Sequence, residues 1–191
     1  MDGYGGGVLD LRNKLQCVQG NNPRSISFMI QTTHTRNAVI LATGGANFDA
    51  AFFVTLAFGG AASIIQIDVY YAGFYPSTVK VVTDGLWHTV LITYDGTRLS
   101  IYVDGILDNT ATSWNSGSYS TISSTLNTAG NKVVLGQWAD VGSRWIGKLK
   151  NVMFFDNVIS ISYALANNYQ SAGSILYDSG NLLINLITDV Y

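Results

Sequence analysis

The acidic residues limit the chemistry that this chain can perform. All twelve are aspartates, and the sequence contains no glutamate. Hydrolysis of a glycosidic bond uses two carboxyl groups held a fixed distance apart, one as acid and the other as base or nucleophile. Asp68 stands alone on an apolar segment, while Asp104 and Asp108 flank a turn. The spacing therefore predicts no catalytic pair, although a pair assembled from distant loops stays open.

The nucleophilic and phosphate-binding residues are equally few. The chain has two histidines and one cysteine, and it lacks a G-x-S-x-G sequence. We interpret His88 as a hydrogen-bonded sheet residue, His34 as a solvated residue of a polar turn, and Cys17 as a small buried hydrophobe. No glycine-rich segment carries the lysine of a phosphate-binding loop. These patterns predict a protein that is not an enzyme.

Residues 84–106 are the stretch that must position the rest. Val90, Ile92 and Tyr94 alternate with Thr89, Leu91 and Thr93, and Leu99, Ile101 and Val103 alternate with Ser100, Tyr102 and Asp104. This period of two is typical of strands. Asp95-Gly96 and Asp104-Gly105 tolerate the positive φ angles of hairpin tips. The sequence predicts three consecutive antiparallel strands here, with a type I′ turn at Asp104-Gly105.

The remaining chain also favours an all-β fold, because it holds 20 glycines, 11 tyrosines and 4 tryptophans in 191 residues. We expect an aromatic loop at 70–76 and a long polar loop at 113–131. Further strands are expected at 8–18, 25–30, 38–43, 51–58, 63–70, 106–112, 132–138, 145–155 and 182–188.

The central motif resembles the signature hairpin of the concanavalin A-like jelly rolls, in particular laminin G-like and pentraxin-like domains. The matching residues are Trp87, His88, Val90, Tyr94, Asp95, Gly96, Leu99, Tyr102, Val103, Asp104 and Gly105, with Ile101 as one extra residue. Residues 145–155 resemble the closing strand of these domains, with Trp145 in place of phenylalanine, and 159–169 their short helix. The resemblance implies a two-sheet antiparallel β-sandwich, a jelly roll with one short C-terminal helix.

The resemblance divides the chain into three parts. Residues 1–7 are expected to be a glycine-rich leader or linker, and 8–172 the laminin G-like jelly-roll domain. Residues 173–191 form an apolar extension that completes the sheet or an oligomer interface. The first ten residues contain no apolar run, so the sequence shows no signal peptide. We interpret the chain as a piece of a larger protein at the cell exterior or a particle surface.

Calcium is a cofactor that the resemblance suggests. Members of this family often bind it at the rim of the sandwich through loop oxygens, which is the ligand type that calcium prefers. The candidate ligands are Asn47, Asp49 and Asp140. The alternative is that these residues serve only as turn formers.

Sugar binding needs aromatic rings that stack on pyranose C–H groups, together with amide and carboxylate partners for the hydroxyls. Tyr71, Tyr75, Trp114 and Tyr119 lie in loop or polar contexts and are the candidate ligand-binding residues. Exposed aromatic residues also occur at protein interfaces. The other tryptophans, Trp87, Trp138 and Trp145, are expected in the core.

Three functions remain open after this reading: a non-catalytic carbohydrate-binding or adhesive module, a structural or attachment domain of a virus or phage particle, and a glycosidase or polysaccharide lyase. The glucanases of this fold carry E-x-D-x-x-E, which a chain without glutamate cannot contain. A formal net charge of −2 with scattered basic residues argues against nucleic acid, and no apolar run is long enough to insert into a membrane. We expect a glycan or a cell-surface polysaccharide as partner, and a homo-oligomer.

Overall fold

The computed structural model describes residues 8–10, 19–45, 51–56, 63–69, 73–74, 80–111, 114–115, 122–123, 126–129, 132–136, 144–168 and 182–186. The strands are β1 (Val8–Asp10), β2 (Arg24–Gln31), β3 (Ala38–Gly44), β4 (Ala51–Leu56), β5 (Ile65–Val69), β6 (Gly73–Phe74), β7 (Trp87–Tyr94), β8 (Leu99–Val103), β9 (Ile106–Ala111), β10 (Trp114–Asn115), β11 (Ile122–Ser123), β12 (Lys132–Leu135), β13 (Lys148–Phe155) and β14 (Leu182–Leu186), and the helix is α1 (Ile161–Asn168).

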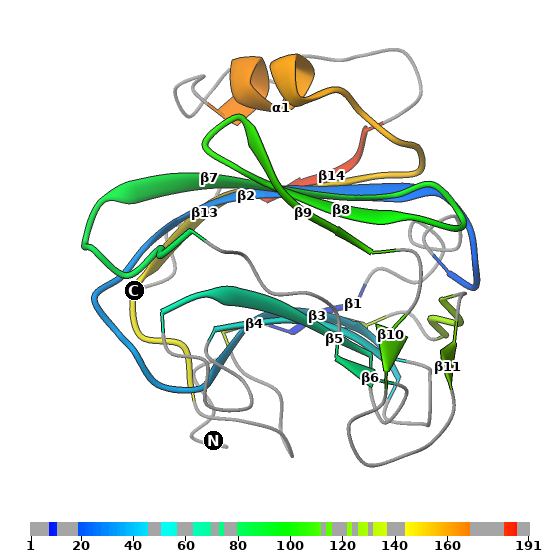
Figure 1. The fold of residues 1–191 in the computed structure, drawn as a ribbon, viewed down its shortest axis with the longest axis horizontal. Helices are drawn as coiled ribbons and strands as arrows, with labels where there is room; N and C mark the ends of the chain where they lie inside the picture. Colours follow the sequence, from blue (N-terminus) through cyan, green and yellow to red (C-terminus); the bar gives the residue numbers. More distant parts are fainter. Residues whose placement is uncertain are drawn as a thin grey trace.

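These strands form two antiparallel sheets that face each other (Figure 1). The lower sheet in that view has eight strands in the order β1-β12-β3-β4-β5-β6-β10-β11, and the upper has six in the order β14-β13-β2-β7-β8-β9. The expected fold, an all-β jelly-roll sandwich with one short C-terminal helix, is confirmed.

The central hairpins match the sequence prediction. β7 pairs with β8 and β8 with β9, both antiparallel. Asp104 and Gly105 have φ angles of 50° and 84°, the two positive values that a type I′ turn requires. The backbone N–H of Asp104 also donates to the Thr89 carbonyl at 2.8 Å, which fixes the turn against β7.

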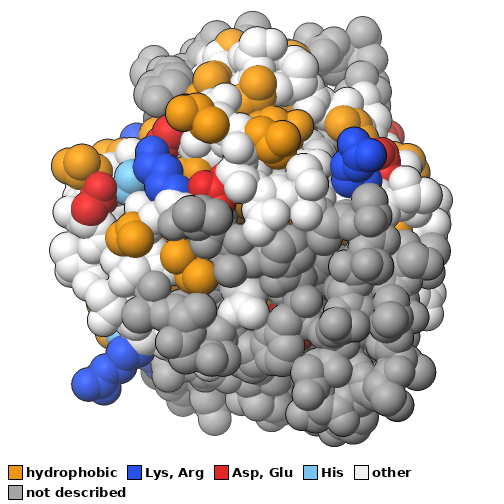
Figure 2. Space-filling view, in the orientation of Figure 1, with side chains coloured by type: hydrophobic (Ala, Val, Ile, Leu, Met, Phe, Trp, Pro, Cys, Tyr) orange, Lys and Arg blue, Asp and Glu red, His pale blue; other side chains and the backbone are white. Residues whose placement is uncertain are grey.

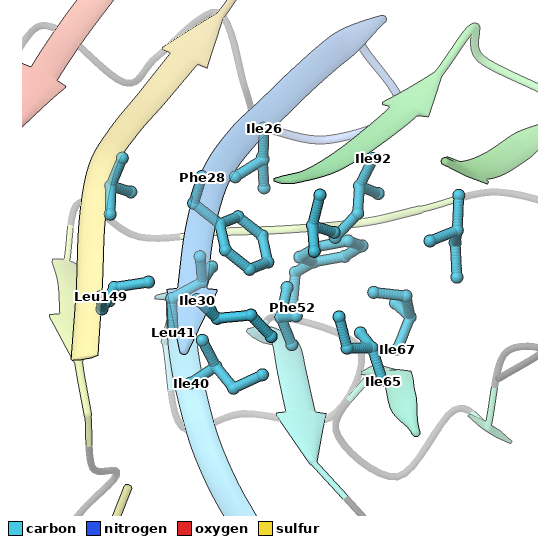
Figure 3. Close-up of a cluster of buried hydrophobic side chains, with 14 of the residues drawn as sticks. Ile26, Phe28, Ile30, Ile40, Leu41, Phe52, Ile65, Ile67, Ile92 and Leu149 are labelled. Carbon is cyan, nitrogen blue, oxygen red and sulfur yellow. The ribbon is translucent and has the colours of Figure 1, made fainter. Parts of the chain in front are cut away.

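The core lies between the sheets and is built by the inward positions of both (Figure 3). Phe28 and Ile92 of the six-stranded sheet meet Phe52 and Ile67 of the eight-stranded sheet, and all are at most 2% exposed. Alternation explains this set, because every second residue of a strand points to the same face. Leu91, from the opposite face of β7, is buried as well, so this strand is covered on both sides.

The second cover comes from α1, which lies across the outer face of the six-stranded sheet (Figure 1). The ring of Tyr163 meets that of Phe155 edge-on, with centroids 5.8 Å apart. Gly105 lies beneath the helix, since a Cβ there would stand 3.0 Å from Leu165 Cδ1. The helix therefore packs on both the closing strand and the β8–β9 turn.

The C-terminal extension contributes β14, which pairs with β13 of the same chain through Val152–Leu186 and Phe154–Ile184. Two predicted loops contain short strands: β6 falls within 70–76, and β10 and β11 fall within 113–131. A strand of two residues shows no period of two, which is why the sequence pattern missed them. At the N-terminal end β1 covers three residues of the expected strand 8–18, and residues 11–18 lie outside the described part of the chain.

Candidate functional site

The outer face of the eight-stranded sheet carries a row of side chains suited to binding. Phe53 pairs with Asp68, Asp68 with Phe74, and Phe74 with Asn115. Residues directly opposite each other in antiparallel strands share a face, and Phe52 already faces the core, so these four positions belong to the outer face. In register, the position of Asp68 thus lies between those of two phenylalanines, and the position of an asparagine follows.

Phe53 gives this face an apolar floor. It is fully buried in a second, smaller cluster with Val39, Ala42 and Ala51. Asp68 is its cross-strand neighbour and is 8% exposed. Burial raises the pKa of the Asp68 carboxyl to about 6. No hydrogen-bond or ion-pair partner of this carboxyl lies among the described residues.

Gln66 adds a second acceptor to the same face, because it precedes Asp68 by two positions on β5. Its Oε1 atom is buried and has no hydrogen-bond partner. The Thr55 hydroxyl, on the facing strand, donates to the Gln66 backbone carbonyl at 3.1 Å and leaves the side-chain amide untouched. Asp68 and Gln66 therefore place two acceptors on one face of β5, and neither meets a donor among the described residues.

A carboxylate pair for glycoside cleavage is missing from the strands of this sheet. Asp68 and Asp10 are their only acidic residues, and β1 lies four strands away from β5. Neighbouring strands are about 4.8 Å apart, which gives roughly 19 Å across the sheet. Glycosidase carboxyl groups lie about 5 to 9.5 Å apart. These strands can bind a polar ligand but hold no hydrolytic pair.

A second polar cluster lies at one end of β7, on the other sheet. The His88 ring is buried and contacts Asp104 Oδ2 through Nδ1 at 2.8 Å and Asp84 Oδ1 through Nε2 at 2.9 Å. Lys80 Nζ lies 2.5 Å from Asp104 Oδ2, and the Thr89 backbone N–H donates to Asp104 Oδ1 at 2.9 Å. In Figure 2 blue, pale-blue and red atoms meet at the left of the upper layer, with hydrophobic side chains around them.

Hydrogen bonding sets the charge state of this cluster. Burial raises the pKa of Asp104, but the hydrogen bonds from Lys80, His88 and the Thr89 backbone outweigh it and lower the pKa overall. The Leu86 backbone N–H and His88 lower the pKa of Asp84. Each ring nitrogen of His88 is in contact with a carboxylate oxygen. His88 is therefore a hydrogen-bonded sheet residue, as the sequence indicated, with neither nitrogen open to a substrate.

The residues predicted to bind a ligand fall mostly outside the described part of the chain: Tyr71, Tyr75 and Tyr119 for sugar, and Asn47, Asp49 and Asp140 for calcium. Trp114 begins β10, which pairs with β6 through Asn115 and Phe74. Trp114 and Asn115 are adjacent on this strand, so their positions belong to opposite faces of the sheet. Tyr71 and Tyr75 flank β6 in the sequence. The pairing of β6 with β10 therefore brings strands from the two predicted loops, 70–76 and 113–131, side by side near one edge of the sheet.

The calcium candidates follow two neighbouring strands. β3 and β12 are antiparallel, with Thr43 opposite Val133 and Leu41 opposite Leu135. The segments that follow β3 and β12, which contain Asn47 with Asp49 and Asp140, begin at opposite ends of this pair. Within the described ranges no group of three or more His, Cys, Asp or Glu side chains is arranged to hold a metal ion.

The tryptophans divide differently from the prediction. Trp145 is 6% exposed and belongs to the core, as expected. Trp87 is only partly buried, and the ammonium of Lys150 lies 4.2 Å from its ring centroid, so its assignment to the core was wrong. Trp138 lies outside the described residues. Sequence reasoning noted Asp68 but missed its setting, because only the register shows which residues flank it.

Solved structures of similar fold include several that bind sugars. A proposed carbohydrate-binding protein from Bacteroides ovatus ATCC 8483 has a TM-score of 0.61 at 16% identity, over 88% of this chain and 46% of that one. The CBM40 of the Ruminococcus gnavus IT-sialidase, bound to α2,6-sialyllactose, has a TM-score of 0.56 at 18% identity, over 85% and 93%. The heptameric SAP-like pentraxin of Limulus polyphemus has a TM-score of 0.55 at 17% identity, over 90% and 83%.

These identities establish the fold alone, and this chain spans less than half of the Bacteroides ovatus protein. No curated protein matches the sequence. The sequence does match the family described as the Concanavalin A-like lectin/glucanases superfamily, of the laminin G type, over residues 4–162.

Proposed function

Since this chain belongs to the Concanavalin A-like lectin/glucanases superfamily, we propose that it is a non-catalytic carbohydrate-binding module. The observation that carries the proposal is the outer-face row in which Asp68 lies between Phe53 and Phe74, next to Asn115. A sugar site needs polar groups for the hydroxyls and aromatic rings for stacking. In this proposal the row supplies the polar groups and the adjoining segments supply the rings, because Phe53 is fully buried. The lack of glutamate supports binding without cleavage.

The proposed contact surface extends from this row to the aromatic residues of the adjoining segments. Tyr71 and Tyr75 lie within two residues of β6. Trp114 is the first residue of β10, and Tyr119 follows the end of β10 by four residues. We assign the stacking of sugar rings to Tyr71, Tyr75 and Tyr119, because Trp114 precedes Asn115 by one position and so belongs to the opposite face of β10. The sugar hydroxyls would then meet the acceptors of β5.

A glycan array on the full chain tests this function. We expect binding to at least one class of oligosaccharide. The double variant Tyr71→Ala with Tyr75→Ala should bind about thirtyfold more weakly, because each of the two stacked rings contributes on the order of 1 kcal/mol. Tyr102→Ala is the matched control, since Tyr102 lies on β8 of the other sheet. Absence of signal for every sugar would refute the proposal.

Calcium enters as part of the same proposal, with Asn47, Asp49 and Asp140 as its ligands. Oxygen ligands from such residues fit a hard divalent cation. Repeating the array in calcium and in a chelator should lower binding in the chelator, and an equal signal in both would remove calcium from the site. Calorimetric titration of calcium into the sugar-free chain measures the same site directly.

A role in assembly is the alternative, as a structural or attachment domain of a virus or phage particle. It is favoured by the exposure of Ile106 and Leu107, which are 70% and 51% exposed on the edge strand β9. Either role places the module at a cell exterior or particle surface, within a larger protein. Among the described helices none is long and apolar enough to span a bilayer.

A further inference from the structure

We propose, on the premise of the glycan-binding function above, that Asp68 and Gln66 form an acceptor pair that selects neutral, hydroxyl-rich sugars and rejects sugars that carry a carboxylate. Both side chains belong to the outer face of β5, and their Cα atoms, two positions apart, are separated by about 6.7 Å. Asp68 is more than nine-tenths buried and Gln66 Oε1 is fully buried.

The pair lacks donors that a ligand would have to supply. The chain offers Asp68 no hydrogen-bond partner among its described residues, and Gln66 Oε1 has none either. A buried acceptor without a donor has lost its bonds to water and gained none in return, and the cost is larger when the acceptor is charged. Sugar hydroxyls are donors, so a bound sugar relieves this cost at two points.

The same geometry disfavours acidic ligands. A second carboxylate beside Asp68 would meet a like charge where water is nearly excluded. The strands β4, β5, β6, β10 and β11 contain no lysine, arginine or histidine that could compensate this second negative charge. A site of this kind discriminates through what it repels as well as through what it attracts.

The apolar neighbours strengthen both effects. Phe53 is fully buried on one side of Asp68, and Phe74 pairs with Asp68 on the other. Electrostatic and hydrogen-bond interactions gain strength where the surroundings are apolar. The carboxylate therefore acts as the specificity-determining residue, and the buried ring of Phe53 sets the environment in which it acts.

The test compares neutral and acidic probes on the full chain at pH 8, where Asp68 is ionised. Lactose and arabinotriose are neutral probes, α2,3- and α2,6-sialyllactose are acidic ones, and an array of neutral and uronic-acid oligosaccharides widens the set. We expect the wild-type chain to bind its best neutral sugar at least about tenfold more tightly than any acidic counterpart. Asp68→Asn should weaken the binding of the neutral sugar about tenfold and reduce the ratio of neutral to acidic affinity.

Asp156→Asn is the matched control, because Asp156 lies in the turn after β13, away from this sheet. Asp68→Asn should also unfold at a temperature no lower than the wild type, so that weaker binding cannot be ascribed to loss of fold. Tighter binding of acidic sugars by the wild type would overturn the selectivity while leaving the glycan-binding function intact. Neutral binding that is equal in Asp68→Asn and Asp156→Asn would equally overturn it. Silence towards every sugar would refute the function itself.

Discussion

Asp68 shows how a single buried carboxyl links the candidate site to stability. Its pKa is about 6 in the folded chain and 3.8 when unperturbed, so the folded state binds the proton more tightly. The associated stability is fully present below pH 3.8 and is lost as the pH rises through 6. A site residue that costs stability when ionised is a common consequence of function.

Asp68→Asn should therefore stabilise the protein at neutral pH. The two-unit difference in pKa corresponds to at most about 3 kcal/mol, and we expect about 1 to 3 kcal/mol in the free energy of unfolding at pH 7.5. At pH 3.5 the wild type is protonated as well, so the difference should vanish. Urea denaturation at both pH values measures this, and a variant that is less stable at pH 7.5 would contradict it.

The stability contributed by Asp104 depends on pH in the opposite direction. Burial raises the pKa of Asp104, but the hydrogen bonds from Lys80, His88 and the Thr89 backbone lower it below 3.8 overall. Its stabilising contribution is present above pH 3.8 and is lost as the pH falls through the lower folded value. Asp104→Asn should reduce the free energy of unfolding at pH 7 by about 1 to 2 kcal/mol, since the hydrogen bonds to a charge are weakened.

Backbone strain separates two variants at this position. Asp104 has a φ of 50°, which asparagine tolerates and alanine does not. Asp104→Ala should therefore cost about 1 kcal/mol more than Asp104→Asn. The difference in the free energy of unfolding between the wild type and Asp104→Asn should shrink as the pH falls below 3.8. A difference that stays constant down to pH 3 would show that Asp104 does not have a lowered pKa in the folded chain.

At the scale of elements, two glycines with positive φ allow the cost of a steric clash to be distinguished from the cost of backbone strain. Gly147 precedes β13 with a φ of 153°, and a Cβ there would stand 2.6 Å from the Gln31 carbonyl oxygen and 2.8 Å from Thr32 Cβ. Gly20 has a φ of 56° and nothing within 4 Å of the same position. Gly20→Ala should cost about 1 kcal/mol through φ alone.

Gly147→Ala should lower the free energy of unfolding by about 3 kcal/mol or more, because the clash with backbone adds to the strain. Thermal and urea unfolding of both variants measures the difference. Equal losses would mean that β13 and β2 separate at little cost at this end of the sheet.

The sequence predicted the long elements because their periodicity is a property of the chain itself. β7, β8 and β9 follow from alternation and two Asp-Gly pairs, and α1 from the family resemblance. The short strands β6 and β10 depend on pairing with each other, which no local pattern encodes. The neighbours of Asp68 are set by register across three strands, so the sequence offered the residue but not its site.

Burial on both faces of β7 has the same origin. Thr89, Leu91 and Thr93 alternate with the core residues and read as a solvent face, yet each is at most 6% exposed. The cover comes from α1 on the outer face of that sheet (Figure 1). A helix that packs across a sheet changes the meaning of a pattern that lies far from it in sequence.

At the scale of the whole molecule, the edges of the six-stranded sheet decide how copies could associate. β14 occupies one edge, beside β13, and β9 occupies the other. On β9 the register shifts so that Asn109 pairs with Ile101 and Leu107 with Tyr102, which leaves Asp108 as a bulge. A bulge on an edge strand hinders pairing with another strand. Association through continuous sheet at β9 is therefore disfavoured.

The apolar side chains of β9 offer the better contact for the expected homo-oligomer. Ile106 is 70% exposed and Leu107 51% exposed, and burying a side chain of this kind contributes about 1.5 to 3 kcal/mol. We expect light scattering to give a mass that is a multiple of 20.6 kDa, and the double variant Ile106→Lys with Leu107→Lys to return it to 20.6 kDa. Val158→Lys is the control, because Val158 is 47% exposed but precedes α1. A wild-type mass of 20.6 kDa would show that β9 stays solvated, and the assembly role would then lose its only structural support.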